Sequence, residues 1–294
     1  MIKNIKYFIR FLINLTKLSV QLFKGQSVDY EVLQICHRIE KGLLIPNPRP
    51  RWGWDKIHRL ISLESQDEFV KTLKESIISK YLNAKLSSGD SYDVEEAKRI
   101  ISPDDKNRAG VLVLKKRDVL VDWEIGKQLF LTRHSIRDFS DKRIIKKDLE
   151  DAIALANRCP SACNRQLTKV YVVDGAERHR LCNSDVEGIY PPCFLLITGN
   201  INAFAKDEMY DWMVSSSIFA GYLSLSLHLK GIGSCCLRKP LWIESESMKE
   251  MREYFNIPEE EQIVLEMAIG YYKDEFTVAQ SSRRSPNDIL VLKN

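Results

Sequence analysis

Two stretches of this sequence carry most of the information about its fold: Arg133-His134-Ser135-Ile136-Arg137-Asp138-Phe139 and Cys159-Pro160-Ser161-Ala162-Cys163-Asn164-Arg165-Gln166. The first places two arginines and a serine at alternate positions, which point to one face of an extended backbone. Forked guanidinium groups and a hydroxyl suit a phosphate and the polar edge of a heterocycle. The second stretch is small, polar and turn-forming, and would let backbone approach a flat ligand. Together they predict a site for a phosphorylated ring compound.

The order of the two stretches resembles the nitroreductase family of FMN-dependent oxidoreductases, which has an Arg-x-Ser-x-Arg-x-Phe motif followed by a Pro-Ser-x-x-Asn-x-Gln turn. The similarity runs from about Trp123 to the C-terminus. A long helix of small residues that ends at Gly231-Ile232-Gly233-Ser234, and a late arginine at 284, add to it. The resemblance implies an α+β fold with a mixed sheet flanked by helices.

The resemblance also implies roles for individual residues. Arg133 and Ser135 would contact the FMN phosphate and ribityl chain, and Arg137 would reach the pyrimidine side of the ring. His134 would lie at the edge of the site. The further cofactor-binding candidates are Pro160, Ser161, Ala162 and Asn164, supplied by the other subunit, and Gly231, Gly233, Ser234 and Arg284.

The family resemblance further implies a homodimer that takes hydride from NADH or NADPH and passes it to a small organic acceptor by a ping-pong mechanism. No side chain is singled out as a catalytic acid or base, and no metal site or nucleic-acid partner is expected. The alternative function is a flavin-binding or structural module without turnover, in a polysaccharide or envelope pathway.

Simpler interpretations of the same residues stay open. Asp138 and Asp141 could pair with the arginines in an ordinary surface loop. Asn164 could serve only as a turn residue, Gly231 as a helix stop, and Arg284 as part of a charged tail. The family turn usually continues with proline and an aromatic residue, where this chain has Leu167 and Thr168. This departure leaves packing beside the ring, and thus substrate choice, open.

The 294-residue chain has a net charge of +4, and its basic excess lies at the N-terminus. Residues 1–60 hold 11 Lys/Arg and 4 Asp/Glu, a net charge of +7. Residues 2–23 are spaced as an amphipathic helix. This helix would pack on its own protein or on a dimer partner, or residues 1–24 would lie on an anionic membrane surface. Charge interrupts the apolar run too often for a transmembrane helix or signal peptide.

Residues 1–118 are expected to form a mostly helical extension and residues 119–294 an FMN-binding domain. The stretch from His37 to Leu43 and the Pro/Arg loop at 46–50 resemble extensions on nitroreductase-like proteins of bacterial surface-polysaccharide gene clusters. The seven cysteines show no metal-binding spacing and predict reduced thiols. The expected location is therefore cytoplasmic, with the inner membrane surface as a second possibility.

Apolar periodicity predicts the elements themselves. Helices are expected over 66–87 and 93–101, from Trp123, over 149–156 before Pro160, and over 207–230. The last should be buried on most sides, in a core or against a second subunit. Short apolar runs at 170–173 and 194–197 predict central strands, and 263–269 predicts the last strand. Since regular βαβ repetition is absent, an α+β arrangement is favoured over a doubly wound sheet.

Overall fold

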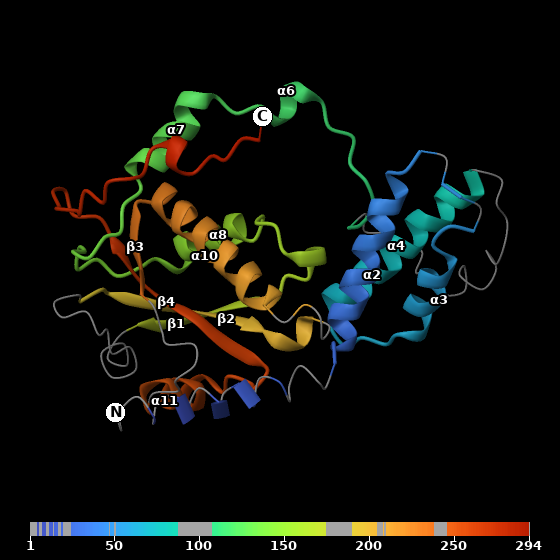
Figure 1. Ribbon diagram of the computed structural model, residues 1–294, viewed down its shortest axis with the longest axis horizontal. Coiled ribbons are helices and arrows are strands. Elements are labelled where there is room, and N and C mark those ends of the chain that lie inside the picture. Colours follow the sequence, from blue (N-terminus) through green and yellow to red (C-terminus); the bar gives the residue numbers. More distant parts are fainter. Residues whose placement is uncertain are drawn as a thin grey trace.

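The computed structural model describes residues 25–46, 48–49, 51–87, 108–174, 190–204, 208, 210–237 and 246–293, with positions 5, 8, 9, 12, 13, 15, 16 and 19. The predicted helix over 93–101 lies outside the described residues. Figure 1 shows two units, a group of N-terminal helices and a sheet covered by helices, joined by an exposed segment that carries the short helix α6 (Lys116–Val119).

The N-terminal unit is built from α2 (Val28–Leu43), α3 (Trp54–Ser62) and α4 (Glu68–Ser87). These helices bury apolar side chains in a core of their own. Helix α2 ends before Pro46, as expected for a residue that cannot continue a helix. The predicted helix over 66–87 is confirmed as α4.

A four-stranded sheet forms the second unit, in the order β1 (Thr168–Asp174), β2 (Cys193–Asn200), β4 (Glu261–Tyr271), β3 (Ile232–Leu237). The three strand pairs are antiparallel. A single parallel bridge joins Ser135 to Ser234, which makes the sheet mixed. The predicted α+β fold is confirmed.

Helices cover both faces of the sheet (Figure 1). Leu195 and Ile197 of β2 pack with α8 (Lys146–Ala156) and α10 (Asp211–Leu229) on one face. Phe194 and Leu196, the alternate residues, pack on the other face with α11 (Glu246–Phe255). Because both faces are covered, β2 is almost entirely buried, which explains its unbroken apolar sequence.

Two strand predictions need correction. Residues 170–173 form β1, which is an edge strand of the described sheet and is partly exposed, so the prediction of a central strand is wrong there. Strand β3 and helix α11 were not predicted. In β3, one glycine, one serine and two cysteines occupy the four central positions, and Ile232 is its only β-branched residue, the type that usually signals a strand.

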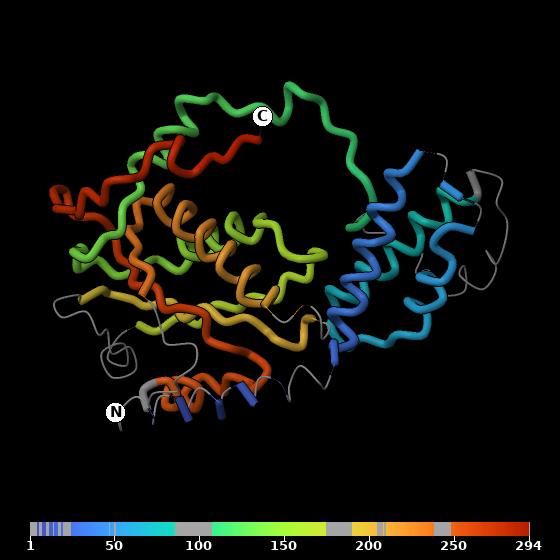
Figure 2. Tube along the Cα trace, in the orientation of Figure 1, coloured from blue at the N-terminus to red at the C-terminus, as the bar shows by residue number. Residues whose placement is uncertain are grey.

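The N-terminal unit contacts the sheet unit at one end of α2, as Figure 2 traces. Ser27 N donates to Asn202 O at 2.9 Å, and Gln26 Nε2 donates to Ala203 O at 3.0 Å. These acceptors belong to η2 (Ile201–Ala203). Helix α2 also contacts η1 (Ala162–Asn164), the turn of the second sequence motif. The division between residues 118 and 119 stays a prediction.

All described positions before residue 20 are helical, in agreement with the predicted amphipathic helix. Within the described part of the chain, the helices are too short or too polar to cross a bilayer.

Candidate cofactor site

The first motif lies in extended backbone along β3. Helix α7 (Trp123–Thr132) ends at Arg133, its C-cap. Ile136 N donates to Ser234 O at 3.0 Å, and Ser140 N donates to Tyr271 O at 3.0 Å. Ile136 is buried, while Ser135 and Arg137 on either side of it are exposed, as alternation in extended backbone predicts.

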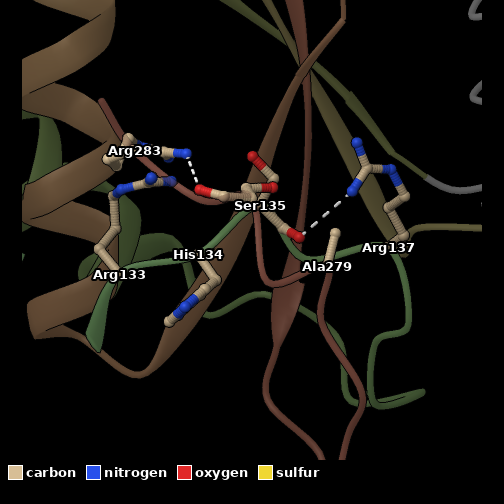
Figure 3. A pocket seen from close by; sticks show the side chains of 7 residues that line it. Arg133, His134, Ser135, Arg137, Ala279 and Arg283 are labelled. Carbon is tan, nitrogen blue, oxygen red and sulfur yellow. Dashed lines mark hydrogen bonds between the residues drawn. The ribbon is translucent and has the colours of Figure 1, made fainter. Parts of the chain in front are cut away.

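These residues line a shallow pocket that is open to solvent. Figure 3 shows Arg133 beside Arg283 of the C-terminal segment, and Arg137 on the other side of Ser135. The remaining lining residues are Ala279 and Ser281. None of the lining side chains is acidic, so the pocket carries a concentrated positive charge.

The acidic residue of the motif pairs with a lysine and not with the arginines of the motif. Asp138 pairs with Lys273, at 2.5 Å between Oδ1 and Nζ. Arg137 Nη1 donates weakly to the Ser135 carbonyl at 3.5 Å. In the part of the chain that the structure describes, neither Arg133 nor Arg137 forms an ion pair. Two forked cations without a protein counter-ion suit an anionic ligand.

Two glycines allow the motif to lie against the sheet. A Cβ on Gly233 would come within 2.7 Å of Ile136 Cγ1, and a Cβ on Gly270 would come within 2.7 Å of Phe139 Cβ. Gly231 has φ +69°, which a glycine adopts without strain, and Gly231 N bonds to His228 O at the end of α10. Gly231 therefore ends the helix, and Gly233 accommodates the motif.

Replacing Gly233 with alanine is expected to lower the free energy of unfolding by about 1–3 kcal/mol, because the added methyl overpacks the Ile136 contact. Denaturant titration measures the change. The control is Gly126→Ala in α7, where nothing lies within 4 Å of the added Cβ and stability should rise by up to about 1 kcal/mol. Equal stability of Gly233→Ala and the unmodified protein would contradict the packing argument.

His228 fixes the start of the motif and was not found from the sequence. Its Nε2 lies 2.8 Å from Thr132 Oγ1, and its Nδ1 lies 2.7 Å from Tyr272 Oη. The ring thus ties α10 to α7 and to the residue after β4. Burial, with the nearby charges of Arg133 and His134, lowers the pKa of His228 below its ordinary value of 6.5. A lone histidine in the last turn of an apolar helix offers little signal in the sequence.

The lowered His228 pKa predicts a pH dependence of stability. The unfolded chain binds a proton near pH 6.5 that the native site resists, so the histidine's contribution is complete above about pH 6.5 and is lost as the pH falls. The free energy of unfolding should therefore decline more steeply between about pH 7 and pH 5 in the unmodified protein than in His228→Asn. Urea titrations across this range measure both slopes, and parallel slopes would refute the prediction.

The second motif forms a strained turn. Cys163, Asn164 and Gln166 have φ values of 52°, 53° and 49°. Left-handed backbone costs about 1–2 kcal/mol for a residue with a Cβ, and asparagine tolerates it best. Ser161 holds the turn from inside, because its carbonyl accepts from Asn164 N at 2.9 Å and its Oγ accepts from Gln166 N at 3.2 Å. Pro160 is exposed just before it.

The pocket and the turn lie near opposite ends of α10. Ala162 N donates to Ser215 Oγ at 3.3 Å, near the start of this helix. Near the other end of α10, His228 forms a hydrogen bond with Thr132, which directly precedes the pocket residue Arg133. At 1.5 Å per residue, Ser215 and His228 are about 20 Å apart along the helix axis. Ser234, whose Oγ donates to Ser224 Oγ at 3.2 Å, is on the pocket side. One chain therefore does not bring the two motifs together.

The structure places three further residues differently from what the family motifs suggest. Arg283, which lines the pocket, was the weaker match to the family's late arginine, while Arg284 is exposed and outside the lining. Leu167, the residue that departs from the family turn, is buried in a cluster with Ile201 and Phe204.

In the described ranges, no group of three or more His, Cys, Asp or Glu side chains could hold a metal ion.

Comparisons with known proteins agree with the motifs. The model of the nitroreductase family matches residues 131–191. A protein of Archaeoglobus fulgidus, provisionally named NADH dehydrogenase/NAD(P)H nitroreductase, is 30% identical over 151 residues, which cover 50% of this chain and 86% of the relative.

Solved structures with a similar fold cover little more than half of the chain. A nitroreductase family protein from Clostridium difficile 630 is 18% identical, with a TM-score of 0.48, and covers 57% of this chain and 97% of its own. An FMN-dependent nitroreductase from C. difficile R20291 is 22% identical, with a TM-score of 0.47, and covers 57% and 99%. The sequence similarity to the archaeal relative over most of its length, on top of the matching family model, shows that the chain belongs to the nitroreductase family.

Proposed function

We propose that this chain is an FMN-dependent oxidoreductase that oxidises NADH or NADPH and reduces a small organic acceptor. The observation that carries the proposal is the cluster of unneutralised arginines in the pocket of a nitroreductase-family chain. Guanidinium groups and a serine hydroxyl match the phosphate of FMN in charge and in hydrogen-bonding geometry. The name of the archaeal relative supports a nicotinamide as the electron donor.

In this proposal, the pocket residues bind and orient the cofactor. Arg133 and Ser135 hold its phosphate and ribityl chain, with Arg283 or Arg284 closing from the C-terminal segment. Arg137 lies beside the pyrimidine edge, where a cation stabilises negative charge. Bound FMN would supply the hydride chemistry, with donor and acceptor using one place in turn. His134 is held at the edge of the site, since its Nδ1 lies 2.9 Å from the Thr132 carbonyl oxygen.

A second copy of the chain completes the site in this proposal. Helix α10, expected to be buried on most sides, leaves one stripe uncovered that includes Val214, Ile218, Tyr222 and Leu229. Between them, a Cβ on Gly221 would meet nothing within 4 Å, so another backbone can approach closely. Apolar side chains at 289–292 are also exposed. A C2 dimer through this stripe would carry the turn of one subunit toward the pocket of the other.

The test of turnover uses FMN-loaded protein without oxygen. NADH and NADPH are added separately, and the visible flavin absorption is followed. The proposal expects the absorption to fall with at least one nucleotide and to return when a quinone or nitroaromatic is added. Absorption that persists with both nucleotides would favour the alternative, a flavin-binding module without turnover.

We also propose that the N-terminal helix holds the enzyme at the cytoplasmic face of an anionic membrane. Ile5, Phe8, Ile9, Leu12 and Ile13 share one helical face and are exposed, Phe8 by 60%. Residues 1–24 contain five Lys/Arg and no Asp/Glu. An apolar face combined with positive charge fits an anionic bilayer better than a neutral one.

Vesicle flotation tests the membrane contact. The full chain should float with phosphatidylglycerol vesicles, less with phosphatidylcholine vesicles, and less at high salt. A chain that begins at Val28 is the control and should stay in the dense fraction. Equal flotation of the two chains would exclude this role for the helix.

A further inference from the structure

We propose that Arg165 is a positioning residue through which helix α2 of the N-terminal unit fixes the cofactor-facing turn. The inference rests on the proposed role of this turn in binding FMN. It gives the N-terminal helices a part in the site although they lie outside the region matched by the family model.

Arg165 connects three elements from inside the protein. Its side chain is 0% exposed. Its Nη2 donates to Glu208 Oε2 at 2.8 Å, and its guanidinium carbon lies 4.5 Å from the centre of the Phe204 ring. With the amide of Gln34 turned so that Oε1 faces the guanidinium, that oxygen accepts from Arg165 Nη2 at 2.6 Å.

Gln34 makes this link a property of α2. It is buried in that helix, and in the same amide orientation its Oε1 also accepts from Arg38 Nη2 at 3.1 Å. Figures 1 and 2 show this end of α2 beside the turn between α8 and β1. One amide oxygen therefore holds two arginines, one on the helix and one on the turn.

The backbone of the turn needs such an anchor. Arg165 is in the right-handed helical region, with φ −73°, between residues in left-handed conformations. Ala162 is fixed to α10 through Ser215, but the bonds of Asn164 and Gln166 return to Ser161 within the turn itself. Non-glycine residues in such backbone persist only where their surroundings determine it. The buried Arg165 side chain supplies that determination for the second half of the turn.

The charge of Arg165 is poorly explained as a source of stability. Its Nε and Nη1 have no acceptor among the described residues, and a buried ion pair is often no more stabilising than an apolar side chain of similar size. A role in fixing the backbone of the turn would explain why a guanidinium is present at this buried position. Because Glu208 is partly exposed, water can solvate its carboxylate in Arg165→Met, and this variant should still fold while losing the fixed turn.

Hydrogen exchange and FMN titration test this role in the full chain. Arg165→Met and Gln34→Leu are each expected to speed amide exchange at residues 162–166 about tenfold and to weaken FMN binding about tenfold. The double variant should bind no more weakly than Arg165→Met alone, since both changes remove one link. Arg165→Lys keeps the positive charge and should restore part of the protection against amide exchange. The restoration should be incomplete, because an ammonium cannot reproduce the forked contacts of a guanidinium. Arg158→Met, at an exposed position before the turn, is the matched control.

Unchanged exchange in the turn with unchanged FMN affinity in both variants would overturn the inference. Faster exchange throughout the sheet would show a merely structural role and would also overturn it. If the unmodified protein binds no FMN, the proposed function fails, while exchange of the turn in the cofactor-free variants still decides whether Arg165 and Gln34 hold it.

Discussion

Replacing Arg133 with methionine is expected to weaken FMN binding about 10- to 100-fold. A hydrogen bond to a charged group contributes about 1.5–3 kcal/mol, and each 1.4 kcal/mol corresponds to about a tenfold change in the dissociation constant. The Arg133 guanidinium has no protein counter-ion in the described part of the chain, so its removal should subtract cofactor affinity rather than break an internal ion pair. Quenching of FMN fluorescence during titration measures the change.

The matched control for this prediction is Arg143→Met. Arg143 is exposed and pairs with Asp174 at 3.1 Å, away from the pocket. Exposed pairs contribute about 0–1 kcal/mol, so this variant should bind FMN as the unmodified protein does. If Arg133→Met and Arg143→Met bind FMN equally well, Arg133 does not contact the phosphate.

Replacing Ile218 with glutamate should convert a dimer to monomers and abolish FMN binding in the same protein. Ile218 lies in the middle of the exposed stripe on α10. An unpaired carboxylate buried there would cost several kcal/mol in each subunit. Because one chain holds the pocket and the turn about 20 Å apart along α10, a monomer would keep only half of the site.

Sedimentation velocity measures the assembly, and FMN titration measures the site. Val172→Glu is the matched control, since Val172 is comparably exposed on β1 rather than on α10, and it should leave both properties unchanged. The two-subunit site would be contradicted if Ile218→Glu stayed dimeric, or if monomers bound FMN with full affinity.

The sequence was sufficient for the parts of the fold that depend on local pattern. Continuous apolar runs located β2 and β4, and the small-residue periodicity located α10. The two motifs led to the family because their residue types and order are specific. Strand β3 was missed because its pairing with β4 is a long-range interaction, and only Ile232 among its residues is of the β-branched or aromatic type that favours strands.

The site was predictable only in part, for the same reason. Alternation in the first motif indicated which side chains share a face, but the contributions of His228 and Arg283 depend on how distant segments pack. Arg165 looked like one more polar residue of a turn, and its complete burial against α2 depends on a tertiary contact. The distance between the motifs is likewise set by the length of α10 rather than by their separation in sequence.

Stoichiometric reconstitution with FMN is the measurement closest to the central claim, that the arginine pocket and the proline-serine turn of a second copy hold one flavin. Purified protein is saturated with FMN, freed of unbound cofactor and examined by its visible spectrum and subunit mass. We expect a yellow dimer with one FMN per chain. A colourless protein, or a flavin bound just as tightly by a monomer, would contradict the account.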